Sequence, residues 1–331
     1  MRLQPARKCP RRQASLRASN RCGEGRLEPL LAARKRRGGW PVQVVRSRVI
    51  IDAMRAFVVG LPLLVGFATT TVAVAAELPI FDAHLHYSHD TRDVLPPKTA
   101  IEILRKAGVR QALISSSNDD GTQALYAEAP DIVIPELRPY RMRGDISTWV
   151  RDESVIPYVE GRLKRYRYVA IGEFHVYGAD ADLPVPRRMV QLARQHRIFI
   201  HIHSDADAVE RVFRQDPGAR VLWAHAGFDS PTRVREMLLK HQNLWCDLAW
   251  RTDHAPEGKL NPEWHPLFLE LPDRFMVGTD TPSPQRWYFV EEHARLSRLW
   301  LSELPRDVAE RIAYRNGEAV FGPLAASLKN K

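Results

Sequence analysis

From Glu77 onward, short apolar runs alternate with stretches of helical period. Eight runs have the length and composition of strands, near residues 78–83, 109–115, 131–137, 168–174, 197–203, 220–225, 244–249 and 274–279. Helical patterns lie between or after them, for example Thr99–Ala107, Pro186–His196, Ala206–Gln215, Pro231–His241, Trp287–Leu301 and Arg306–Phe321. Eight strand–helix units in about 250 residues predict an α/β fold, a single (β/α)8 TIM-type barrel over residues 77–323 with a short tail at 324–331.

The chain has 331 residues and a formal net charge of +10, but this charge is unevenly distributed. Residues 1–53 hold 14 Lys or Arg and three acidic residues, so the rest of the chain carries a net charge of −1. The first segment has no hydrophobic period, which is typical of a disordered basic extension or of a mis-annotated start. An organelle transit peptide is the alternative, because the segment is rich in Arg and poor in acids. The near-neutral body predicts no nucleic-acid partner.

Residues 54–76 have the pattern of a secretory signal peptide. Met54 and Arg55 precede a short apolar run, and small residues follow in the sequence Val72-Ala-Val-Ala-Ala76. The run is shorter than the roughly 20 apolar residues of a membrane span, so we expect cleavage rather than a stable membrane anchor, with an uncleaved anchor as the alternative. The expected location is periplasmic or secreted. Cys246 is the only cysteine after this segment, so the body predicts no internal disulfide.

Six residues of metal-ligand type lie where the predicted strands end. They are His84 and His86 in Asp82-Ala-His-Leu-His86, Glu173, His203, His225 and Asp280. Side chains alternate along a strand, so the two histidines of the first strand point the same way. Catalytic groups of such barrels gather at the C-terminal strand ends, so all six are expected around one mouth. Imidazole and carboxylate ligands predict one or two divalent ions, with zinc expected.

These motifs resemble those of the amidohydrolase superfamily, most nearly its amidohydrolase-related and TatD-like branches. Asp82-Ala-His-Leu-His86 is similar to the D-x-H-x-H opening, Ile171-Gly-Glu173 to the strand-four carboxylate, and His203-Ser204 to the strand-five ligand. His225-Ala-Gly227, Gly278-Thr-Asp280 and Asn316–Gly322 match later motifs. The resemblance implies that His84, His86 and Asp280 bind one ion, and that His203 and His225 bind or flank a second. It also implies that Glu173 takes the bridging place that a carbamylated lysine holds in many relatives.

The candidate chemistry is hydrolysis by a metal-activated hydroxide. Asp280 is expected to act as general base and then general acid, with His225 as a further catalytic group. Arg138, His175 and Arg286 are candidate substrate-binding residues, since guanidinium groups at the mouth favour an anionic substrate. His201 is either a residue that orients a ligand or a core histidine.

The predicted substrate is a small, anionic ester, lactone or amide. A metal-dependent decarboxylase is the alternative function, because the resemblance implies the same ligand scaffold for such lyases. A TatD-like nuclease ranks third, because it needs a basic groove. The sequence leaves the substrate, the metal and the oligomeric state open.

Overall fold

The computed structural model of the protein describes residues 77–328. The predicted basic extension, the predicted signal peptide and the last three residues lie outside the described residues. No helix among residues 77–328 is long and apolar enough to cross a membrane.

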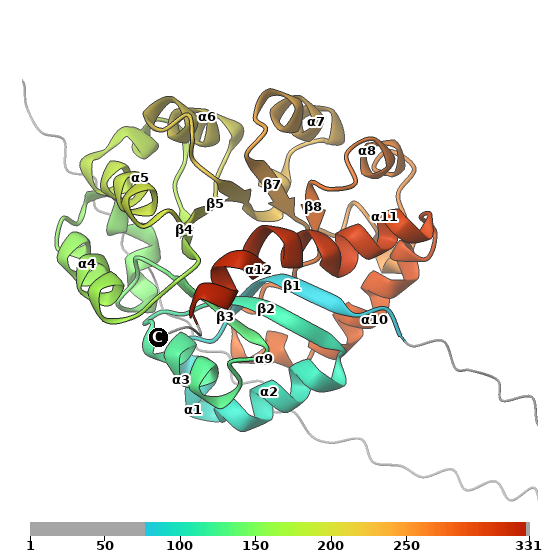
Figure 1. Ribbon diagram of the computed structural model, residues 1–331, viewed down its shortest axis with the longest axis horizontal. Helices are drawn as coiled ribbons and strands as arrows, with labels where there is room; N and C mark the ends of the chain where they lie inside the picture. Colours follow the sequence, from blue (N-terminus) through green and yellow to red (C-terminus); the bar gives the residue numbers. More distant parts are fainter. Residues whose placement is uncertain (1–76, 329–331) are drawn as a thin grey trace, which may run out of the picture. The chain divides into compact units, whose positions relative to one another are not determined.

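Eight parallel strands follow one another around a barrel in the order β1-β2-β3-β4-β5-β6-β7-β8 (Figure 1). Each strand pairs in parallel with the next one in sequence, as repeated strand–helix units require. The strands are β1 (Ile80–His86), β2 (Val109–Ser115), β3 (Val133–Leu137), β4 (Ala170–His175), β5 (Phe199–His203), β6 (Val221–Trp223), β7 (Leu244–Asp247) and β8 (Phe275–Met276).

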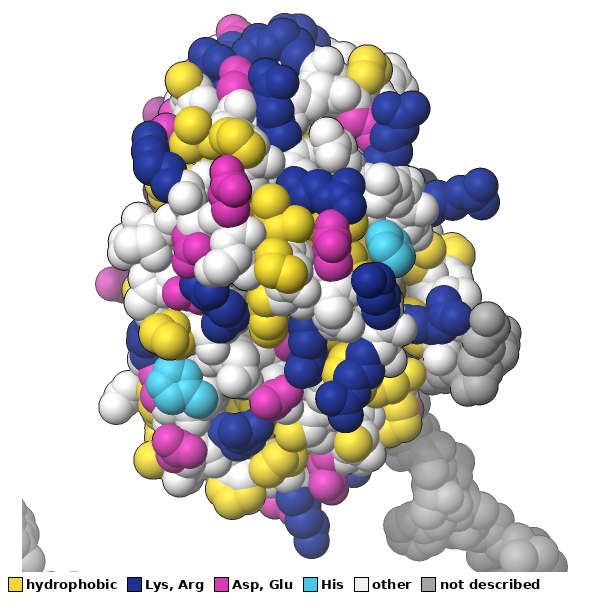
Figure 2. All heavy atoms as spheres, turned by 90° about the vertical axis from the view of Figure 1, so that its left-hand side faces the viewer, with side chains coloured by type: hydrophobic (Ala, Val, Ile, Leu, Met, Phe, Trp, Pro, Cys, Tyr) yellow, Lys and Arg dark blue, Asp and Glu magenta, His cyan; other side chains and the backbone are white. Residues whose placement is uncertain are grey.

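Helices surround the strands on the outside (Figure 1). They are α1 (His89–Val94), α2 (Pro97–Lys106), α3 (Asp120–Glu128), α4 (Val155–Arg165), α5 (Pro184–His196), α6 (Ala206–Gln215), α7 (Pro231–Lys240), α8 (His265–Glu270), α9 (Pro284–Trp287), α10 (Val290–Leu301), α11 (Arg306–Glu310) and α12 (Asn316–Leu328). Their outer faces mix charges of both signs. Figure 2 shows Lys and Arg interspersed with Asp and Glu over one side of the molecule.

The barrel closes between β1 and the segment that follows β8. The backbone N–H of Ala83 donates to the Val277 carbonyl at 2.9 Å, and the N–H of Asp280 donates to the His84 carbonyl at 2.8 Å. The Asp82 carboxylate reinforces this seam, because it accepts bonds from the Thr279 N–H at 3.0 Å and the Thr279 hydroxyl at 2.5 Å. The seam places the first and last predicted ligands next to each other.

Helix α12 crosses the end of the barrel that faces the viewer in Figure 1. Its Phe321 packs against Phe81 at the start of β1 and Phe199 at the start of β5, with ring centroids 6.0 and 4.7 Å apart. This apolar plug closes the N-terminal end of the barrel. The predicted ligands lie toward the opposite, C-terminal end of the strands.

The eight predicted strands and their order are confirmed. Strands β6 and β8 are shorter than predicted, because the chain leaves the sheet before His225 and Asp280, both of which have left-handed backbone angles (φ 56° and 54°). Helix α4 lies between β3 and β4. Helix α12 extends to Leu328, five residues past the predicted end of the barrel domain at residue 323.

Candidate metal centre

His84 and His86 on β1 turn their Nε2 atoms toward each other, 3.1 Å apart. The other ring nitrogen of each is already bonded: Nδ1 of His84 lies 3.3 Å from the Asp247 carboxylate, and Nδ1 of His86 lies 3.0 Å from the Ser115 hydroxyl. Since Nδ1–H can donate to these oxygens, Nε2 of each ring is free to offer a lone pair. Two facing lone pairs repel each other unless a cation lies between them.

Glu173 on β4 lies between two pairs of histidines, His84 with His86 and His203 with His225. Its Oε2 lies 3.2 Å from Nε2 of His86 and 3.6 Å from Nε2 of His84. Its Oε1 lies 2.8 Å from Nδ1 of His203 and 3.7 Å from Nε2 of His225. The two oxygens of one carboxylate thus serve different imidazoles, which is the arrangement of a bridging ligand.

Asp280 and His225 approach from just beyond β8 and β6. Oδ1 of Asp280 lies 3.4 Å from Nε2 of His86, is buried, and has no hydrogen-bond donor among the described residues. Nδ1 of His225 lies 2.7 Å from the Ala249 carbonyl, which fixes the tautomer with its lone pair on Nε2. His225 and Asp280 both have left-handed backbone angles, which are unfavourable for residues other than glycine. Such strained backbone conformations are concentrated at functional sites.

His203 and His175 complete the side of the site next to β4 and β5. Their rings stack with centroids 4.1 Å apart, and Nε2 of His175 lies 4.0 Å from Glu173 Oε1. The Tyr140 hydroxyl lies 3.2 Å from Nδ1 of His175 and holds that ring in place. The structure therefore brings the six predicted ligands together, and His175 forms a further candidate group with Glu173 and His203.

Beneath the ligands lies a buried network that the sequence analysis did not assign, except for His201. The Asp247 carboxylate on β7 contacts Nδ1 of His84 and lies 3.0 Å from Nε2 of His201. Nδ1 of His201 lies 3.0 Å from Glu136 on β3. Two acidic residues inside apolar strand runs were the available signal, because carboxylates are almost never fully buried without a partner.

The network fixes several protonation states. Burial opposes a charge on His201, but the charge of Glu136 and the hydrogen bonds that His201 donates to Asp247 and Glu136 raise the pKa of His201 to about 9. Burial and the charge of Arg138 lower the pKa of His86 to about 4, so this ring is neutral at pH 7. Burial also disfavours a protonated His84, but Asp247, Glu173 and Asp280 outweigh it and raise the pKa of this imidazole well above its usual range.

The site therefore fits a divalent cation. Four buried carboxylates contact its imidazoles, those of Glu136, Glu173, Asp247 and Asp280, whereas the cationic groups among them are Arg138, protonated His201 and, when no metal is bound, protonated His84. The excess of negative charge and the unpaired Asp280 oxygen both favour a positive ion, and the donor set of imidazole nitrogens and carboxylate oxygens is the one zinc prefers. A proton on Nε2 of His84 would compete with a metal ion for the lone pair of that atom.

A cavity of about 110 Å³ opens above these residues, lined by His86, Glu173, His203 and Asp280 of the site and by the predicted substrate-binding residues Arg138 and His175. Arg138 is buried and bonded to Glu173 through Nη2 at 2.9 Å. Arg286 is not brought into this cavity. Its guanidinium donates to the Thr279 carbonyl at 3.0 Å, so it supports the backbone next to Asp280.

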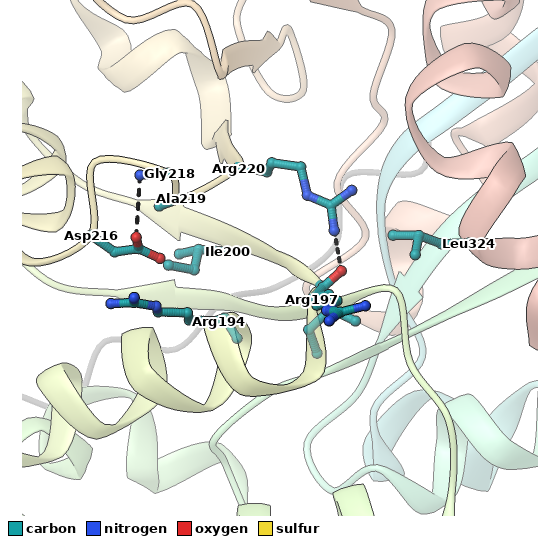
Figure 3. Close-up of a pocket in the computed structure, with 10 residues that line it drawn as sticks. Arg194, Arg197, Ile200, Asp216, Gly218, Ala219, Arg220 and Leu324 are labelled. Carbon is teal, nitrogen blue, oxygen red and sulfur yellow. Dashed lines mark hydrogen bonds between the residues drawn. The ribbon is translucent and has the colours of Figure 1, made fainter.

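A larger cavity of about 770 Å³ lies at the other end of the barrel (Figure 3). Its walls come from the connections that lead into β5 and β6, and include Arg194, Arg197 and Arg220. Figure 3 shows Arg220 bonded to the Arg197 carbonyl and Asp216 bonded to the Gly218 N–H. None of the predicted ligands lines this cavity, so its size does not make it the reaction site.

A comparison with known protein families identifies the family of this chain. Residues 152–322 match the amidohydrolase family, which is just over half of the chain. The chain belongs to the amidohydrolase family. The protein is therefore an enzyme of a superfamily that uses divalent metals, and the matched segment contains Glu173, His203, His225 and Asp280. The likeness to TatD-like enzymes stays a prediction.

Solved structures resemble the barrel of this amidohydrolase. An uncharacterized TIM-barrel protein from Bordetella bronchiseptica has a TM-score of 0.52 and 16% identity, covering 75% of this chain and 100% of its own. A protein from Agrobacterium tumefaciens has a TM-score of 0.48 and 17% identity, covering 75% and 97%. A probable 2-pyrone-4,6-dicarboxylic acid hydrolase from Acinetobacter baumannii has a TM-score of 0.49 and 12% identity, covering 73% and 99%. No curated protein matches the sequence. The first of these likenesses supports the barrel fold.

Proposed function

We propose that this amidohydrolase is a metal-dependent hydrolase of small, anionic esters, lactones or amides. The observation that carries the proposal is the convergence of three Nε2 lone pairs, from His84, His86 and His225, with the carboxylates of Glu173 and Asp280. These residues, with His203, would hold one or two ions, and we propose zinc. When bound, the metal supplies Lewis acidity toward a water nucleophile and toward the oxygen under attack.

The remaining chemistry belongs to side chains of the chain. Asp280 carries a buried carboxylate oxygen that has no donor within residues 77–328, so it is placed to accept the proton of the attacking water. It then returns that proton to the leaving oxygen or nitrogen, as the new carbon–oxygen bond forms and the old bond breaks. His225 Nε2 lies 4.0 Å from Asp280 Oδ2, so its lone pair and that carboxylate would face the same ion.

An anionic substrate is supported by two arginines that line the cavity. Arg138 lies beside Glu173, and Arg143 contributes a half-exposed guanidinium that contacts Asp90 and the Pro282 carbonyl. Exchange of these partners for a substrate carboxylate needs only a side-chain movement of Arg143. Arg141 does not line the cavity, because Asp145 and Asp152 hold its guanidinium at 3.0 and 2.5 Å.

Metal analysis of the purified protein, combined with a screen of esters, lactones and amides, tests the proposal. We expect bound metal, hydrolysis of at least one class, and loss of both in His84→Ala, which deletes a ligand. Glu257→Ala is the control, since this residue lies on the connection between β7 and α8 and does not line the site cavity. A metal-free, inactive protein would contradict the proposal. Release of carbon dioxide instead of addition of water would assign the site to a lyase.

A further inference from the structure

Exposed aromatic side chains concentrate at the mouth of the barrel. Among the described residues, four large aromatic side chains are strongly exposed: Tyr177, Phe228, Trp250 and Tyr288. All four lie on connections that follow a strand, after β4, β6, β7 and β8. Apolar surface gathered in one region of a protein marks a binding site more often than scattered exposure does.

Two of these rings contact the imidazoles of the site. Phe228 stacks on His225, with centroids 4.7 Å apart and planes inclined by 20°, and lies 6.0 Å from the ring of His203. Tyr177 meets His203 edge-on at 6.1 Å. Both rings keep about half of their surface exposed, 51% for Phe228 and 52% for Tyr177. They therefore form an open aromatic border outside the 110 Å³ cavity, on the side of the site where His203 and His225 lie.

The backbone at Phe228 is a second, independent observation. This residue has φ of 53°, a left-handed conformation that is unfavourable for any residue with a Cβ and more so for a bulky one. The chain thus holds a large apolar ring in a strained and half-exposed place, directly over a candidate ligand. Such strain at a ligand-contacting residue is typical of a functional position.

The other two exposed rings, those of Trp250 and Tyr288, do not contact the imidazoles of the site among the described residues. Trp250 is covered by the guanidinium of Arg286, which lies 4.5 Å from its ring centroid. Tyr288 is the most exposed of the four and makes no ring contact with a site histidine among the described residues. The candidate subsite is therefore limited to Tyr177 and Phe228.

We propose that Tyr177 and Phe228 form a subsite for a planar, apolar ring of the substrate. This inference rests on the proposed function, because it describes the substrate of the same site. A substrate with its ring against these two side chains and its negative charge toward Arg138 and Arg143 would span the mouth from β4 and β6 to the β3 connection. The preferred substrates are then aromatic, or otherwise planar and cyclic, carboxylic acid derivatives.

A matched pair of esters tests the subsite: methyl phenylacetate and methyl cyclohexylacetate share the leaving group and chain length and differ in ring planarity. Both esters are neutral, so their comparison tests the ring subsite separately from the arginines. We expect the metal-loaded wild-type enzyme to favour the phenyl ester in kcat/KM by about 2- to 10-fold, the range of an aromatic pair. Phe228→Leu and Tyr177→Leu should each reduce this ratio, and the double variant should abolish it. Tyr288→Leu is the control and should keep the wild-type ratio.

Binding of the two product acids, phenylacetate and cyclohexylacetate, separates the subsite from the proposed function. Calorimetry needs no turnover, so tighter binding of phenylacetate that depends on Tyr177 and Phe228 would support the subsite even in a protein that hydrolyses neither ester. Hydrolysis with an equal ratio in wild type and double variant, together with equal affinities for the two acids, would overturn it. A wild-type dimer that becomes monomeric in the double variant would also overturn it, by assigning the rings to an interface between copies.

Discussion

Asp247→Asn is the sharpest test of how the structure prepares the metal ligands. Oδ1 of Asp247 accepts from the backbone N–H of His225 at 3.1 Å and of Ala249 at 3.0 Å. An asparagine keeps those bonds only with its oxygen in that place, so its NH2 group must face His84 Nδ1 and His201 Nε2. Nδ1 of His84 then has to accept, and its proton moves to Nε2. That atom is the one directed at the metal position, so the ring loses its lone pair there.

The expected loss follows from the role of such partners. Carboxylates that orient ligating histidines contribute about 10- to 100-fold in metal affinity. This range corresponds to about 1.4–2.7 kcal/mol of binding free energy. The upper end applies here, because the carboxylate of Asp247 is fully buried.

Competition against a chromophoric chelator measures the zinc affinity of the purified variant, with thermal unfolding as the check on folding. Asp253→Asn is the matched control, because this aspartate follows β7 on the same connection but pairs with Arg251 at 2.6 Å and contacts no ligand. We expect the control to bind zinc like the wild type. A folded Asp247→Asn protein with wild-type affinity would refute the reasoning and would show that the Nδ1 partner of His84 does not set its tautomer.

Asp280→Asn should keep most of the metal but lose about 10²- to 10⁴-fold in turnover, because the amide preserves an oxygen ligand and removes the base; metal analysis with kinetics on one sample checks both. Gly172→Ala should lower the free energy of unfolding by about 1–3 kcal/mol, since its Cβ would lie 2.1 Å from a backbone oxygen, whereas Gly161→Ala in α4, with open space around it, should be neutral or stabilising in the same denaturant titration. Burial lowers the pKa of His254 from 6.5 to about 3. Between these two pH values, His254 is protonated in the unfolded chain and neutral in the folded protein. The free energy of unfolding should therefore decrease as the pH is lowered through this range, by about 2 kcal/mol at pH 5 relative to pH 7. His254→Leu should show a smaller change in Tm between pH 7 and 5 than the wild type. If the predicted signal peptide is removed, mass spectrometry of the native protein should find its N-terminus at Ala76 or Glu77, and peptides from residues 1–53 would contradict that reading.

The sequence alone predicted the barrel and the candidate ligands that it gathers at one mouth. Strand runs of apolar residues separated by helical periods allow few topologies, and parallel strands in sequence order close into a barrel. Since catalytic residues of such barrels lie at C-terminal strand ends, the positions of His84, Glu173 and Asp280 within their runs were enough to bring them to one mouth. The structure places them there, with Asp280 and His84 joined by a backbone hydrogen bond.

Only the tertiary structure decided which arginines reach the cavity and what lies beneath the ligands. Arg138 directly follows β3 and pairs with Glu173, whereas Arg286 lies in α9 after β8 and supports a backbone turn. The sequence does not distinguish these outcomes, because loop conformation is set by packing and hydrogen bonds between distant segments. The network of Asp247, His201 and Glu136 joins three strands that are far apart in sequence. Periodicity shows which face of a strand a residue occupies, but the partner of a buried charge depends on the register and curvature of the closed barrel, and these exist only in the folded chain.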